Sequence, residues 1–227
     1  RLIRHVDELI KHKGIKYTFL LSAKGNKAVN NLFLGRAGIT GTIKAANFDV
    51  YQFLPKKNSP KSTTTVITYQ SSYENEIIDL LNHYNSGFQF GNHLIPKNKI
   101  DGDQAWIAIA NGKVVAFLSV MDMEPYKQNV VLNIPLQVKI PLFILSCFMP
   151  YFKIPKVNQS IKMLYIQNLA YAEHCFSEIL DLIKQARHYT YLKEKTFLSY
   201  GLDTRNPLSK KLKTLASAHF ESEGFVA

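Results

Sequence analysis

The stretch TFLLSAKGNKAVNNLF, from Thr18 to Phe33, reads as an apolar strand, a polar turn with Gly25-Asn26, and a helix. Asn26 stands directly before the helical pattern, where an Asn side chain commonly caps the free N–H groups of the first turn. The chain repeats this order in TFLSYGLDTRNPLSKKLKTL, from Thr196 to Leu215. The two copies begin 178 residues apart, which excludes a short-period repeat and predicts two related domains.

The residues around the first copy predict the order helix, strand, helix, strand. Apolar residues of 2–10 fall on one helical face, and Gly14 follows in the usual position after a helix end. The alternating stretch 48–55 predicts the last strand. Pro55–Thr65 is rich in proline, lysine and small polar residues, which is typical of a linker. We therefore expect two domains, residues 1–57 and 58–227.

Beyond the linker the sequence predicts a longer series of strands and helices. The strongest local signal is WIAIANGKVVAFLSV, in which two apolar strands flank Asn111-Gly112, the preferred pair for a tight type I′ hairpin. Ser71 and Glu74 match a capping box before a helix that extends to about Ser86. The remaining expected elements are strands at 63–69, 163–171, 195–202 and 220–227, and helices at 175–192 and 206–216.

Composition narrows the classes of function. The net charge is +11, which indicates either an anionic partner or a solvated lysine-rich surface. The histidines show no metal-ligand spacing, so we expect no bound metal. Basic and aromatic residues are not interleaved in the way typical of nucleic-acid-binding proteins, so we expect no nucleic-acid partner. The two cysteines have no CxxC spacing, which is typical of free thiols in a reducing compartment, so we expect a cytoplasmic protein.

The most apolar run is PLFILSCFMPYF, from Pro141 to Phe152. It is too short to span a bilayer, so we expect no membrane partner. We interpret it as a segment that is either buried or faces a partner.

The order of elements in 63–227 resembles the GNAT superfamily of acetyl-CoA-dependent N-acyltransferases. The first copy resembles the end of that fold, with Asn26 opening a helix, Phe33 seven residues on and then Gly38-Ile39. More narrowly, the hairpin followed by Asp122 and Lys127-Gln128 is similar to the C-terminal half of bacterial tandem GNAT proteins. The resemblance implies an α/β (mixed α+β) fold: a GNAT-like central mixed sheet flanked by helices, in tandem with a partial first unit.

The resemblance also implies acetyl-CoA as cofactor, acetyl transfer to a small-molecule or peptide amine, and a homodimer as a further expectation. Asn26 would contact the pantetheine arm, or it is a plain helix cap; Lys24 would meet a phosphate, or it is a solvated lysine. For the acceptor site the resemblance points to Asp122, Lys127 and Gln128, which are otherwise surface charges at the exit of a hairpin. Tyr165 and Gln167 share one face of a central strand by alternation and complete the expected substrate-binding set.

The departures from the family pattern support a second hypothesis. The family cradles a pyrophosphate on a glycine-rich turn at a helix N-terminus, but Ala170–Leu180 contains no glycine and carries Glu173. The corresponding turn of the first unit would precede Arg1. Phe33 and Lys213 stand where the family has its acidic Tyr, so no catalytic residue is assigned. The alternative function is therefore a non-catalytic GNAT-like module for binding or dimerisation.

Overall fold

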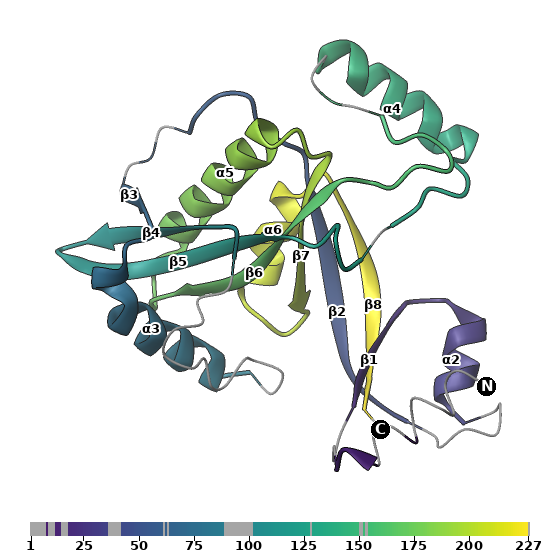
Figure 1. The fold of residues 1–227 in the computed structure, drawn as a ribbon, viewed down its shortest axis with the longest axis horizontal. Coiled ribbons are helices and arrows are strands. Elements are labelled where there is room, and N and C mark those ends of the chain that lie inside the picture. Colours follow the sequence, from purple (N-terminus) through teal and green to yellow (C-terminus); the bar gives the residue numbers. More distant parts are fainter. Residues whose placement is uncertain are drawn as a thin grey trace. The chain divides into compact units, whose positions relative to one another are not determined.

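The computed structural model describes residues 8, 12–14, 18–35, 42–60, 62, 64–88, 102–127, 129–149, 152 and 154–226 (Figure 1). The predicted helix at 2–10, apart from Glu8, and the Gly38-Ile39 pair lie outside these residues. The strands are β1 (Phe19–Ala23), β2 (Ile43–Phe53), β3 (Thr65–Thr68), β4 (Gln104–Ala110), β5 (Lys113–Asp122), β6 (Met163–Tyr171), β7 (Phe197–Asp203) and β8 (Ala218–Val226). The helices are α2 (Lys27–Phe33), α3 (Glu74–Ser86), α4 (Leu136–Phe148), α5 (Phe176–Leu192) and α6 (Leu208–Leu215).

The chain folds into two compact units that do not follow its order. One unit combines Arg1–Tyr51 with Gly201–Ala227, and the other is Gln52–Tyr200. The last helix and strand therefore pack with the N-terminal residues. The domain limits 1–57 and 58–227 describe two related units in sequence, whereas the compact units are defined by packing. The predicted limits therefore stay a prediction.

The first unit contains most of the two copies of the strand-turn-helix pattern, each followed by a further strand; the start of β7 belongs to the second unit. The copies are β1-α2-β2 and β7-α6-β8. The strand order in this unit is β1-β8-β2, with β8 antiparallel to β1 from the pair Phe19 and Val226 to the pair Ala23 and Ser222. The last strand of the second copy thus lies between the two strands of the first copy. The predicted recurrence is confirmed in secondary structure.

The close approach of β8 to β1 requires a glycine. A Cβ atom added to Gly224 would lie 2.7 Å from Cζ of Phe19 and 2.9 Å from Cε2 of Phe48. These two rings pack edge to face, with centroids 5.8 Å apart, so a methyl group at position 224 must separate them. We expect Gly224→Ala to lower the free energy of unfolding by about 1 kcal/mol. Urea unfolding checks this, with Gly201→Ala as control because a Cβ there meets no atom within 4 Å.

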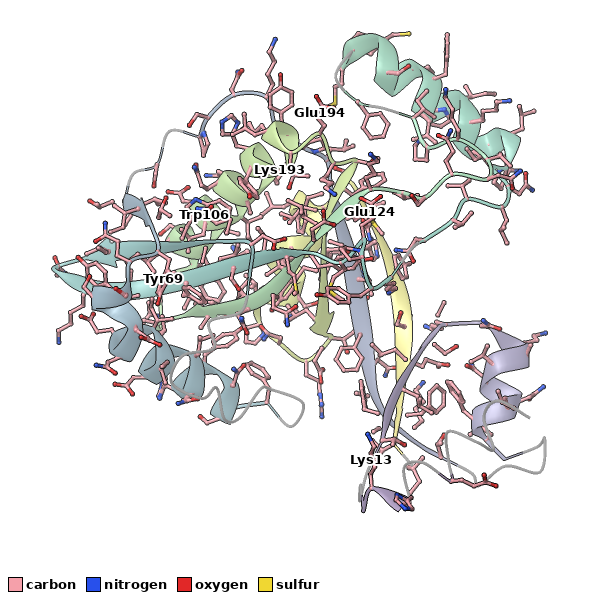
Figure 2. All side chains as sticks on the ribbon, in the orientation of Figure 1. Lys13, Tyr69, Trp106, Glu124, Lys193 and Glu194 are labelled. Carbon is pink, nitrogen blue, oxygen red and sulfur yellow. The ribbon has the colours of Figure 1, made fainter. Side chains whose placement is uncertain are left out.

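The second unit has the strand order β7-β6-β5-β4-β3 and helices on both faces. Strands β4 and β5 form the predicted hairpin, with Asn111 and Gly112 at φ 52° and 73°. Ile107 packs with Ile77 and Leu81 of α3 in a buried cluster. Its neighbour Trp106 points to the opposite face, where its ring lies 5.4 Å from that of Tyr189 on α5 (Figure 2). The fold is mixed α+β, as the sequence predicts.

One sequence prediction, the capping box, is wrong: Ser71–Tyr73 form a 3₁₀ turn, α3 begins at Glu74, and no side chain caps it. The backbone turn satisfies the N–H groups that a capping serine would otherwise bind, since the Tyr73 N–H donates to the Gln70 carbonyl and the Glu74 N–H to the Ser71 carbonyl.

The apolar run from Pro141 begins inside a helix that the sequence pattern did not predict. This helix, α4, begins at Leu136 and contains Pro141. Phe143 and Phe148 of the run are exposed, whereas Phe152 beyond the helix is buried.

Candidate functional site

The ladder between β6 and β7 in the second unit's sheet is short. Its parallel pairing with β7 covers only Met163–Tyr165, opposite Phe197–Ser199, although β6 continues to Tyr171 and β7 to Asp203. Backbone groups alternate between the two sides of a strand, so beyond Tyr165 about every second residue of β6 points its N–H and C=O away from β5. We call this part of β6, which has no ladder pairing to β7, the free edge of β6. Strand backbone without ladder pairing is where an extended ligand can hydrogen-bond.

A β-bulge lies beside this free edge. Ser119 pairs with Asn168 and Val120 pairs with Ile166, which leaves Gln167 as the extra residue of β6. Such a residue has no opposite partner in the ladder. The bulge also breaks the predicted alternation, because Gln167 is exposed while Leu169 is buried. Strand periodicity in the sequence could not show the bulge. One inserted residue moves each later side chain of the strand to the opposite face of the sheet.

Helix α5 begins close after β6, and its N-terminus is the place for an anion in this architecture. Cys175 stands at the N-cap without a capping side-chain bond, and His174 before it has φ 67°. The free N–H groups of a helix start suit an anion. The charges do not, because residues 172–178 carry Glu173 and Glu178 and no Lys or Arg. The charges at this turn therefore oppose a diphosphate.

Three residues of the predicted acceptor set gather where β5 ends and β6 begins. Tyr165 lies opposite Met121, one residue before Asp122. The Lys127 Nζ atom lies 5.6 Å from the centroid of the Tyr165 ring, and the Asn129 amide donates a 2.8 Å hydrogen bond to its hydroxyl. Burial raises the pKa of Tyr165, although the Asn129 bond opposes this. Gln167 lies farther along β6, and Gln128 is outside the described residues.

Lys195, which no sequence pattern indicated, pairs with two carboxylates beside this cluster. Its Nζ atom makes a short contact with Asp122 Oδ2 and lies 3.1 Å from Glu124 Oε2 (Glu124 is labelled in Figure 2). Burial would raise the pKa of Asp122, but hydrogen bonds from Lys195 and from the Glu124 backbone N–H outweigh it and hold that pKa below its usual range. Burial would likewise lower the pKa of Lys195, and its two carboxylate partners raise it instead. The Asp122 charge is thus already balanced within the protein.

The predicted cofactor residues of the first unit have partners within the protein. Asn26 caps α2, since its Oδ1 atom accepts a 3.3 Å hydrogen bond from the Val29 backbone N–H. The Lys24 ammonium contacts the Glu221 carboxylate, which raises the pKa of Lys24. The capping role of Asn26, one of the two readings left open by the sequence, is confirmed. The cofactor contacts of both residues stay predictions.

No tyrosine stands at the positions where the resemblance implies an acidic Tyr. The Phe33 ring packs edge to face against Phe225 at 5.3 Å, within the core of the first unit, and Lys213 is exposed on α6. In the described part of the chain, no group of three or more His, Cys, Asp or Glu side chains is placed to hold a metal ion.

A buried polar cluster of the first unit was also missed by sequence analysis. The Tyr51 hydroxyl lies 3.1 Å from Asp49 Oδ2 and 2.6 Å from Ser209 Oγ. All three residues are at most 5% exposed. Burial, with a smaller contribution from the Asp49 charge, raises the pKa of Tyr51 to about 12, although the Ser209 bond opposes it. Tyr51 and Ser209 are 158 positions apart, so no sequence spacing pointed to this contact.

Comparison with solved structures identifies the fold. A GCN5-related N-acetyltransferase from Kribbella flavida aligns with TM-score 0.57 over 99% of this chain and 73% of its own, at 8% identity. The corresponding protein from Sphaerobacter thermophilus aligns with TM-score 0.55 over 100% and 66%, at 10% identity. N-myristoyltransferase from Saccharomyces cerevisiae with bound myristoyl-CoA aligns with TM-score 0.55 over 99% and 57%, at 10% identity.

No protein-family model and no curated protein sequence matches the chain. At 8–10% identity the structural likeness shows the fold alone. The chain has the fold of GCN5-related N-acetyltransferases, as the resemblance implies, and it spans little more than half of the myristoyltransferase.

Proposed function

We propose that this chain is an acyltransferase that binds the pantetheine arm of an acyl-CoA, acetyl-CoA in the simplest case, along the free edge of β6 and transfers the acyl group to an amine. The observation that carries the proposal is the end of the β6–β7 ladder after Tyr165. The three structural neighbours described above are named as acyltransferases, and the myristoyltransferase was solved with myristoyl-CoA.

The backbone of β6 would do most of the work at such a site. Its outward N–H and C=O groups hold an extended amide chain as an added strand would be held. The bulge at Gln167 supplies a backbone N–H without a ladder partner, which can donate to a carbonyl oxygen that gains negative charge. A bound thioester supplies an activated acyl group. Holding an amine beside it in the right orientation accounts for much of the rate without a dedicated acid.

The acceptor site is proposed at the junction of β5 and β6. Tyr165 lies at the last ladder pair and Gln167 in the bulge, so both border the free edge. Lys127 and Gln128 belong to the connection that follows β5. Asp122 would act mainly by fixing Lys195 and through it the start of β7, because its carboxylate is already paired.

A non-catalytic binding module is the second candidate. It is favoured by the charge at the start of α5, where Glu173 and Glu178 oppose a diphosphate and residues 172–178 include no Lys or Arg. In this reading the free edge of β6 accepts an extended peptide. Formation of a homodimer is the other role proposed for such a module.

Calorimetric titration with acetyl-CoA separates the two candidates. We expect micromolar binding to the wild-type protein, and about fivefold tighter binding to Glu173→Lys at low salt, because the exposed carboxylate becomes a cation near the diphosphate. Asp79→Lys makes the same charge change at an exposed position on α3 and should leave the affinity unchanged. Absence of binding up to millimolar acetyl-CoA would reject the acyltransferase. Equal tightening by both variants would place the diphosphate away from α5.

A further inference from the structure

Helix α4 presents an apolar stripe to solvent. Leu136, Ile140, Phe143, Ile144 and Phe148 are 70%, 54%, 65%, 51% and 82% exposed. Their spacing of four, seven, eight and twelve residues from Leu136 places them on one face of the helix. Contiguous apolar patches of this kind mark interaction sites in soluble proteins. We call these five residues the α4 stripe.

The segment that carries α4 is closed at its base. It leaves the sheet after β5 and returns at β6, and a β-bridge joins Val130 to Ser160 (Figure 1). The Val131 N–H donates to the Gln159 carbonyl at 3.0 Å, and the Asn158 N–H donates to the Val131 carbonyl at 2.7 Å. Beyond α4 the buried Phe152 ring packs edge to face against Phe197 of β7, at 5.9 Å. The α4 stripe is thus exposed on a segment that is anchored at both ends.

The surroundings of this segment are positively charged. Residues 123–162 contain five lysines and one acidic residue, Glu124. Lys156, Lys162 and Lys193 line a hollow of about 490 Å³ at the base of the segment, together with Glu194 and with Lys195, which is paired with Asp122 and Glu124. Within the described part of the chain, neither Lys156 nor Lys162 forms an ion pair. The lysines outnumber the acidic residues at the base of the segment that carries α4.

We propose that α4 docks on an anionic phospholipid surface, with the α4 stripe among the acyl chains and the lysines near the headgroup phosphates. Apolar helices with phenylalanine on one face and nearby lysines bind bilayer interfaces in this way. A helix from Leu136 to Phe148 is about 20 Å long, enough to lie in the interface. None of the helices in the described part of the chain has the length and apolarity that crossing a bilayer requires.

Charge complementarity selects this occupant over a second copy of the chain. Self-association through the α4 stripe would bring two lysine-rich segments together, and like charges at an interface oppose binding. An anionic bilayer instead attracts each lysine near its surface, by about fivefold in affinity per residue. This proposal is independent of the acyltransferase activity.

Vesicle flotation tests the docking directly. We expect the full chain to float with vesicles of phosphatidylcholine containing about one third phosphatidylglycerol, and at least about tenfold less with pure phosphatidylcholine. Phe143→Asp with Phe148→Asp should reduce binding to the anionic vesicles by more than about tenfold, since charged groups are expensive among acyl chains. The double variant Lys156→Glu with Lys162→Glu should reduce binding to the anionic vesicles by a similar factor. It should also abolish most of the salt dependence of that binding.

Ile43→Asp is the matched control, because Ile43 is 77% exposed at the start of β2, outside α4, and should leave vesicle binding unchanged. Circular dichroism and urea unfolding confirm that each variant is folded. Wild-type protein that ignores both vesicle types would overturn the proposal, as would full binding by the double phenylalanine variant. A wild-type dimer in sedimentation that the phenylalanine variant loses, without any vesicle binding, would assign the α4 stripe to a second copy.

Discussion

Replacing Tyr51 with phenylalanine is expected to lower the free energy of unfolding by about 2 kcal/mol. The change removes a hydroxyl that bonds to Asp49 and Ser209 and leaves nearly all the apolar ring contacts in place. The Asp49 carboxylate, 5% exposed, then keeps only the Ser209 hydroxyl at 3.4 Å as a hydroxyl donor. A buried carboxylate that loses a donor carries a desolvation penalty larger than the net value of an ordinary hydrogen bond.

The pH dependence of this effect provides a second readout. The pKa of Tyr51 is about 12 in the folded protein and about 10 in the unfolded chain. Above pH 10 the unfolded chain loses this proton while the folded protein retains it, so this contribution to stability falls as pH rises toward 12. Tyr51→Phe lacks this titrating group and therefore this loss of stability. The free energies of unfolding of the wild type and Tyr51→Phe should therefore converge at high pH.

Urea unfolding at pH 7 and between pH 9 and 11 measures both effects. Asp49→Asn with Tyr51→Phe serves as the paired variant, because it removes the buried charge together with its donor and should recover part of the loss. A Tyr51→Phe protein as stable as the wild type would show that the three polar groups do not support one another.

Replacing Lys195 with methionine is expected to lower the free energy of unfolding by about 2 kcal/mol at pH 7. The Lys195 side chain is 12% exposed and Asp122 and Glu124 are 31% and 32% exposed, so solvent screens the cluster in part and the loss stays below that of a fully buried pair. Without the ammonium, two carboxylates face each other at close range. Lys193→Met is the matched control, since Lys193 is exposed and contacts only the Tyr189 ring, at 5.3 Å.

The sign of the pH dependence follows from the two pKa shifts. The Asp122 pKa is lowered from 3.8, so its contribution is present above that value and is lost as pH falls through the lower, folded pKa. The Lys195 pKa is raised from 10.5, so its contribution is present below that value and is lost as pH rises through the higher, folded pKa. The difference between wild type and Lys195→Met should therefore be largest between about pH 5 and 9 and shrink at both extremes.

Chemical unfolding over that pH range checks the cluster. The triple variant Lys195→Met, Asp122→Asn, Glu124→Gln removes all three charges and should regain most of the lost stability. If Lys195→Met were as stable as Lys193→Met at pH 7, the ion pairs would be ordinary surface contacts.

Much of the second unit follows from local sequence signals. The hairpin at Asn111-Gly112 forms because both positions tolerate positive φ, and the flanking apolar runs pair across it. The strand at 163–171 and the helix ending at Leu192 also appear where their periodicity predicts them. The α4 helix was missed because a proline within an apolar run reads as a break, although a helix can contain one at the cost of a backbone hydrogen bond.

The candidate site was less accessible to sequence reasoning. Asp122, Lys127 and Tyr165 were singled out and lie close together, but the partner that balances Asp122 was not found. Lys195 stands 73 positions from Asp122, and a lone lysine before a strand carries no signal of such a contact. The bulge at Gln167 was equally hidden, because register is decided by the neighbouring strand.

The sequence by itself determined where most of the strands, turns and helices form, α4 excepted, and that the order around Asn26 recurs around Asn206. These features depend on backbone dihedral preferences and on the spacing of apolar residues, which act over a few positions. The tertiary structure alone decided that β8 lies between β1 and β2, that β6 keeps a free edge, and which charges are balanced. Those features depend on which strands pair over long separations, and many pairings share the same local pattern.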